Sequence, residues 1–63
     1  MNAHEIEASR LLSSEELATF LNVPIATIHR WRCKGSAPKA VRVGRHLRFD
    51  MNDVREWMEE RKG

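Results

Sequence analysis

The apolar residues of the chain follow a helical period, then a period of two, and then a helical period again. Leu17, Phe20 and Leu21 lie three and four residues apart, which predicts a short first helix that buries one stripe. Ser13 and Glu16 have the spacing of a capping box, so we expect this helix to begin there and to end near the left-handed terminator Asn22.

A second helix is expected from about Pro24 to Lys34, because only Val23 and Pro24 separate the two apolar patterns. Proline is tolerated in the first turn of a helix, and Gly35 favours the positive φ that ends one. Such a short connection makes two helices cross at a steep angle, which is helix-turn-helix spacing.

The second helix has two distinct faces. Ile28 and Trp31 form the inward stripe. The outward residues lie at three- and four-residue spacing or beside it, so they can point at one groove: Thr27, Arg30, Lys34, Ala26 and His29.

Residues 41–49 change to a period of two, which predicts a β-hairpin with its apolar face on the helices and its tip projecting away. The apolar positions are Val41, Val43, Leu47 and Phe49. They alternate with Arg42, Arg48 and the polar tip Gly44-Arg45-His46, and such a tip suits a phosphate or a narrow minor groove.

Asp50 is placed as the N-cap of a third helix, which closes the core with Val54, Trp57 and Met58. We interpret its outer carboxylates as a solvated face: Glu56, Glu59 and Glu60.

The chain thus predicts one mainly α-helical domain with a small hairpin, spanning residues 11–63 after a polar, flexible leader at 1–10. With one cysteine it forms no intrachain disulfide, and no stretch approaches the roughly 20 apolar residues of a membrane span. We expect a cytoplasmic protein without a deep catalytic cleft.

Charge is distributed unevenly: residues 1–22 carry −3, residues 23–49 carry +7 and residues 50–63 carry −2, although the net charge is only +2. The central stretch contains no Asp or Glu. A basic centre without acids indicates a polyanion partner, since phosphate contacts release counterions. The alternative is a solvated basic face.

Specific chemical roles for single residues, such as metal binding, have less support in the sequence. His29 and Cys33 lie four apart but lack two further ligands, so we expect no metal and no cofactor. We expect Cys33, a small residue, to be partly buried. Trp31 and Trp57 are expected to pack in the core and not to contact a ligand.

An ordered set of motifs carries a family resemblance: Leu12-Ser13-Ser14-Glu15-Glu16-Leu17-Ala18, Asn22-Val23, Thr27-Ile28-His29-Arg30-Trp31, Gly35, Pro38, Arg42-Val43-Gly44-Arg45-His46-Leu47-Arg48-Phe49, Asp53-Val54 and Trp57. With these, residues 11–61 resemble the winged helix-turn-helix domains of phage excisionases, which are related to the DNA-binding domain of MerR-type regulators.

The resemblance implies a non-enzymatic architectural protein that binds adjacent sites on double-stranded DNA, bends the DNA and contacts a phage integrase in a bacterial host. By position it assigns recognition-helix roles to Ala26, Thr27, Arg30 and Lys34, and wing roles to Arg45, His46 and Arg48. Arg42 lies on a wing strand, where ordinary solvent-facing charge is the alternative.

Two positions depart from the family pattern. Pro24 replaces a hydroxyl N-cap, which removes a candidate phosphate contact, and Arg32 replaces an apolar residue. Our hypothesis is that Arg32 supplies a phosphate contact in exchange.

The sequence therefore predicts an excisionase that self-associates on adjacent DNA sites. The alternatives are a small MerR-like transcriptional regulator and a protein-interaction module that docks an acidic partner.

Overall fold

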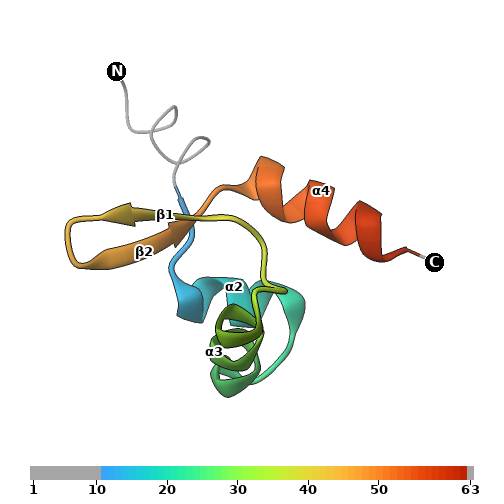
Figure 1. Cartoon of the computed structure of the whole chain (residues 1–63), viewed down its shortest axis with the longest axis horizontal. Coiled ribbons are helices and arrows are strands. Elements are labelled where there is room, and N and C mark those ends of the chain that lie inside the picture. Colours follow the sequence, from blue (N-terminus) through green and yellow to red (C-terminus); the bar gives the residue numbers. More distant parts are fainter. Residues whose placement is uncertain (1–10, 63) are drawn as a thin grey trace.

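Three helices and one hairpin make up the computed structural model, which describes residues 11–62 (Figure 1). The elements in chain order are α2 (Ser14–Leu21), α3 (Ile25–Lys34), β1 (Ala40–Val43), β2 (His46–Phe49) and α4 (Met51–Arg61). This confirms the predicted fold class. The predicted leader at residues 1–10 lies outside the described residues.

The ends of α2 are fixed by the residues that the sequence indicated. The Glu16 amide donates to Ser13 Oγ at 3.0 Å, and the Ser13 amide donates to Glu16 Oε1 at 2.9 Å, so the capping box is complete. Asn22 ends the helix in the left-handed conformation, with φ 58°.

Pro24 and Gly35 bound α3. Pro24 is the N-cap of α3, one position before the first turn in which the sequence placed it, and it makes no side-chain cap hydrogen bond. Gly35 ends α3 with φ 73°. The helix therefore begins without the hydroxyl cap that usually adds about 1 kcal/mol.

The hairpin is antiparallel, with Val41 opposite Arg48 and Val43 opposite His46. Directly opposite residues share a face of the sheet, so both valines lie on the face away from Phe49. Val41 and Val43 are about half exposed. The prediction that they form one apolar face with Leu47 and Phe49 is wrong, because the two-residue turn pairs the strands in a different register.

The turn itself consists of Gly44 and Arg45, and His46 already belongs to β2. Gly44 has φ 62°, whereas Asn22 is the one non-glycine residue with positive φ in the described part of the chain. Positive φ at the first central residue alone is the pattern of a type II′ turn, which suits the twist of a hairpin.

Leu12 adds a pairing that periodicity did not indicate. Its amide donates to the Phe49 carbonyl at 2.8 Å, and the Phe49 amide donates back to the Leu12 carbonyl at 2.7 Å. The segment before α2 is therefore joined to the end of β2 next to the core.

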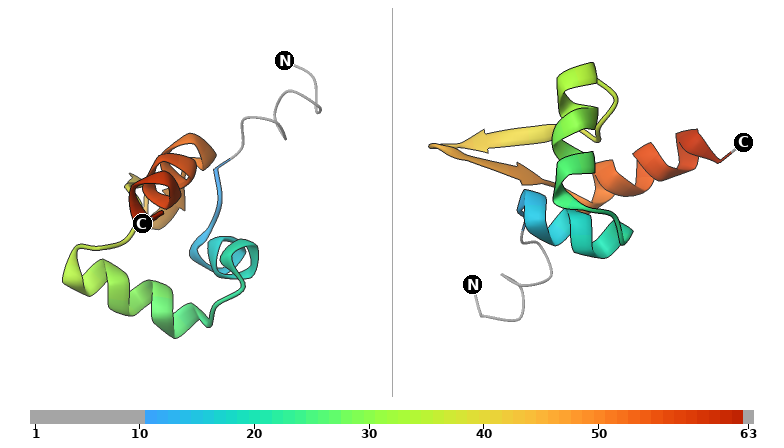
Figure 2. Two further views of the ribbon diagram at one scale, coloured as in Figure 1. Left: turned by 90° about the vertical axis from the view of Figure 1, so that its right-hand side faces the viewer. Right: turned by 90° about the horizontal axis from the view of Figure 1, so that it is seen from below.

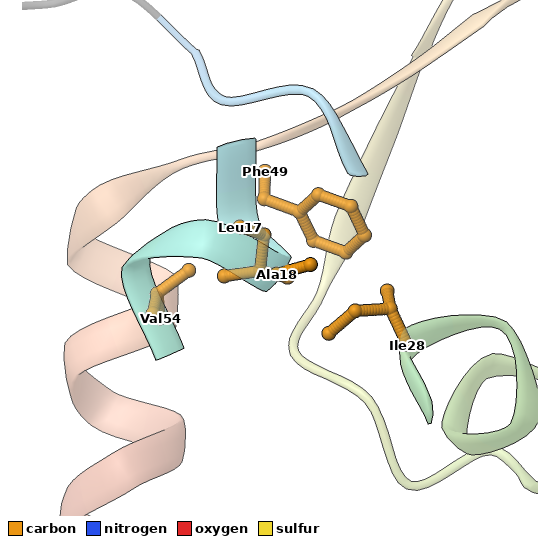
Figure 3. Packing of buried hydrophobic residues seen from close by; sticks show 5 residues of the cluster. All are labelled: Leu17, Ala18, Ile28, Phe49 and Val54. Carbon is orange, nitrogen blue, oxygen red and sulfur yellow. The ribbon is translucent and has the colours of Figure 1, made fainter. Parts of the chain in front are cut away.

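The core takes one or two side chains from each of four elements (Figure 3): Leu17, Ala18, Ile28, Phe49 and Val54. Leu21 and Trp31 pack against it, but Phe20 is 52% exposed. Its assignment to the buried stripe is wrong, since Ala18 occupies that place on the inner face of α2.

Seen from below, α3 crosses the middle of the molecule, with the hairpin on one side and α4 on the other (Figure 2). Figure 1 shows the hairpin and α4 extending in opposite directions from the two remaining helices. The hairpin turn is thus the part of the chain that reaches farthest from the core on its side.

The two phenylalanines give a matched test of this core. Phe49→Ala removes a fully buried ring, and we expect it to cost about 3–5 kcal/mol of unfolding free energy. Phe20→Ala removes a half-exposed ring and should cost under about 1 kcal/mol. Urea denaturation followed by circular dichroism measures both, and equal losses would contradict the core described here.

Candidate nucleic-acid interface

Four exposed residues form a stripe along the outward face of α3. His29 and Arg30 each lie three or four residues from both Ala26 and Cys33, and all four are exposed. Such a stripe points away from the buried Ile28. It brings together three of the predicted recognition residues.

Cys33 belongs to this stripe, so the expectation that it is partly buried is wrong. The reason is helical geometry: Cys33 lies seven residues after Ala26, which is close to two full turns. The sequence pattern contained this signal, since His29 and Arg30 lie on the same stripe. Cys33 is a candidate contact residue that the sequence analysis missed.

The other three predicted residues of α3 lie on its flanks. Arg30 and Arg32 are about 200° apart around the helix, so they cannot face the same groove. Arg32 lines a hollow where α3 meets the base of β1, together with Gly35, Ala37, Pro38 and Ala40. It therefore lies between the recognition stripe and the hairpin.

Lys34 and Thr27 lie on the opposite flank, the one that carries Trp31. Trp31 contacts Trp57 of α4, which shows that this flank faces α4. Lys34 is exposed and reaches solvent, whereas Thr27 is half-buried. Lys34 therefore lies beside the outward stripe and not on it.

The four predicted hairpin residues are divided between the turn and two faces. Arg45 lies in the turn, and Arg42 lies opposite Leu47 on the face that carries Phe49. His46 and Arg48 lie on the other face.

The three hairpin arginines also differ in how exposed they are to solvent. Arg48 is half-buried, and its Nη1 donates to the Leu47 carbonyl at 2.8 Å. Arg42 and Arg45 are exposed, so their guanidinium groups are open to a ligand.

The cations of α3 and the hairpin form no ion pair within residues 11–62. The exposed carboxylates of α4, Glu56, Glu59 and Glu60, lie on a helix that extends the other way. Free cations on α3 and the hairpin therefore create a positive field on one part of the surface, which attracts phosphate.

These positions fit a duplex. An α-helix enters the major groove, which is about 12 Å wide, and arginine there can bind guanine through two hydrogen bonds. Arg30 lies on the outward stripe of α3, and Arg32, Lys34, Arg42 and Arg45 are exposed at other positions of α3 and the hairpin.

Other chemistry has little support in the described part of the chain. Residues 11–62 contain no group of three or more metal-ligating side chains placed to bind an ion. In the same range, no helix combines the length and apolar character that crossing a bilayer requires.

Comparison with protein families shows that a family of helix-turn-helix domains matches residues 11–62. The chain belongs to this family. In helix-turn-helix domains that bind DNA the second helix typically enters the major groove, and α3 has the position of the second helix here. No curated protein matches the chain.

Arg30 gives the most direct test of base contact. Because it lies on the outward stripe and forms no ion pair within residues 11–62, Arg30→Ala should cost about 1–3 kcal/mol on the preferred sequence and relax selectivity at one base pair. Fluorescence anisotropy with specific and random duplexes measures both. Arg55→Ala, an exposed cation on α4, is the control, and equal losses on both duplexes would exclude base contact by Arg30.

A second comparison concerns the two faces of the hairpin. Arg42→Ala should lower the slope of log affinity against log salt by about 1, the value for one phosphate contact. Arg48→Ala should change the slope less, because its guanidinium is engaged with the Leu47 carbonyl. A larger slope change for Arg48→Ala would place the DNA on the other face.

Proposed function

We propose that this helix-turn-helix domain is an excisionase-type architectural protein. It binds attachment-site DNA in the host cytoplasm, bends it, and promotes prophage excision by a phage integrase. It acts by binding and not by catalysis. The matching family occurs in excisionase-like phage proteins, and the motif set in the sequence resembles the same group.

The observation that carries DNA binding is the arrangement of the acid-free stretch. Residues 23–49 fold into α3 and the hairpin, and their cations form no ion pair within residues 11–62. A single α-helix stripe and a neighbouring hairpin then offer base contacts and phosphate contacts side by side. A solvated basic face without a ligand would not require cations on both a helix stripe and a neighbouring hairpin.

Arg32 supports a specific part of this proposal. It lines the hollow where α3 meets the base of β1. In the proposed complex, this is the place between the α3 stripe and the hairpin where the DNA backbone would pass. Arg32 lies in the last turn of α3, the helix whose N-cap, Pro24, offers no side-chain hydrogen bond. Its guanidinium offers a phosphate contact at the other end of α3, in exchange for the one that a hydroxyl N-cap would have made.

One stripe of four residues contacts few base pairs, so useful selectivity requires several protomers on adjacent sites. Self-association then depends on the DNA. The exposed carboxylates of α4 and the basic α3 surface lie on different parts of each protomer, which suits a head-to-tail contact between neighbours.

The experiment is a selection of source-genome fragments retained by the purified protein at physiological salt, with the retained positions mapped. We expect clustered, adjacent sites within a recombination attachment region, and slower gel migration of fragments bound near their middle, as bent DNA shows. Arg30→Ala combined with Arg45→Ala is the control that should abolish retention.

Other results would replace the proposal. Scattered promoter sites without bending would indicate a small transcriptional regulator of the MerR-like kind. No retention, with salt-sensitive binding to an acidic protein, would indicate an interaction module.

A further inference from the structure

Two tryptophans join α3 to α4. The ring centroids of Trp31 and Trp57 are 5.4 Å apart, and their planes are tilted by 50°. Tilted contacts at this distance are favourable for aromatic pairs. Val54, Met51 and Met58 attach α4 to the core.

Ser36 is the point where this attachment reaches the backbone. It lies in the connection between α3 and β1, and its carbonyl accepts hydrogen bonds from Trp57 Nε1 at 2.8 Å and from Arg61 Nη2 at 2.6 Å. The Ser36 amide donates to the Trp31 carbonyl at 2.8 Å, and its hydroxyl donates to the same carbonyl at 3.3 Å. One residue therefore connects the end of α3 to two side chains of α4.

Arg61 is an unusual cation in this domain, because its guanidinium lies over aromatic rings. Its Cζ is 4.4 Å from the Trp57 ring centroid and 5.8 Å from that of Trp31. It forms no ion pair in the described part of the chain. A guanidinium in this position combines a cation–π contact with a charge-assisted hydrogen bond, and such a hydrogen bond is stronger than a neutral one.

We propose that Arg61 is a positioning residue for DNA binding. By fixing Ser36 and the tryptophan pair, it sets the direction of α3 relative to the hairpin that follows the 35–39 connection. Arg61 itself makes no contact with DNA. This inference rests on the proposed DNA binding. It gives the last turn of α4 a positioning role, whereas the cations of α3 and the hairpin are proposed to contact the DNA directly.

The expected effect follows from the fraction of molecules in which α3 and the hairpin are aligned. Apparent affinity falls in proportion to that fraction. Losing one charge-assisted hydrogen bond shifts such an equilibrium roughly tenfold. Affinity for the specific duplex, which needs base contacts, should fall by about this factor, whereas affinity for random DNA should fall less.

Arg61→Ala is compared with Lys62→Ala, which removes the same charge at the next position. Lys62 is exposed and contacts Glu59 at 3.4 Å on the surface of α4, away from the tryptophans. We expect Arg61→Ala to weaken specific binding about tenfold more than Lys62→Ala, with the same salt slope in both variants. Arg61→Lys keeps a cationic donor and should recover part of the loss.

Near-ultraviolet circular dichroism reports the same site, because the chain has two tryptophans and no tyrosine. Arg61→Ala should change this spectrum and Lys62→Ala should not. If thermal unfolding shows that Arg61→Ala is not folded, Trp57→Phe replaces it: a smaller aromatic ring remains but the donor to Ser36 is lost, so specific binding should again fall.

Two results would overturn the inference while leaving DNA binding intact. One is equal specific affinity of Arg61→Ala and Lys62→Ala. The other is a salt slope lower by about 1 in Arg61→Ala alone, since that is the signature of a direct phosphate contact. Absence of duplex binding by the unaltered chain would instead remove the proposed function and the inference together.

Discussion

Burial of Phe49 is the constraint on which the rest of this domain depends. Its ring is fully buried against side chains from α2, α3 and α4, and its backbone exchanges two hydrogen bonds with Leu12. Because it is the last residue of β2, it fixes where the hairpin leaves the core and where α4 begins. A domain of this size has few such residues, so each carries a large share of the stability.

Phe49 also determines which hairpin cations share the side of the helices. The alternation of a strand puts Leu47 and its partner Arg42 on the face of Phe49, and it puts Arg48 and His46 on the other. The DNA-binding surface proposed here therefore consists of the α3 stripe, Arg32 at the junction, Arg42 on the near face and Arg45 in the turn. Arg61 and the tryptophan pair then stabilise the angle between these parts from the side of α4.

The helices were predictable from the sequence because their signals are local. Ser13 with Glu16, Asn22, Gly35 and Asp50 each act within a few residues, and the structure confirms all of them as caps or helix ends.

Signals that depend on strand register or on distant partners were not predictable. The valines of β1 alternate with polar residues, which is the pattern of a strand with one buried face. The two-residue turn nevertheless places them on the face away from the core. The Leu12–Phe49 pairing and the bonds from α4 to Ser36 join residues far apart in sequence. Cys33 differs, since its exposure follows from helical spacing and required only that the stripe be extended by one turn.

The central claim is that duplex DNA binds at the α3 stripe and the Gly44–Arg45 turn. The most direct measurement is a titration of the isotope-labelled protein with a duplex, followed through its backbone amide resonances. The account predicts that the largest shifts cluster at residues 25–34 and 42–46, with small shifts at Glu56, Glu59 and Glu60. Largest shifts on that acidic face, or none at all, would contradict it.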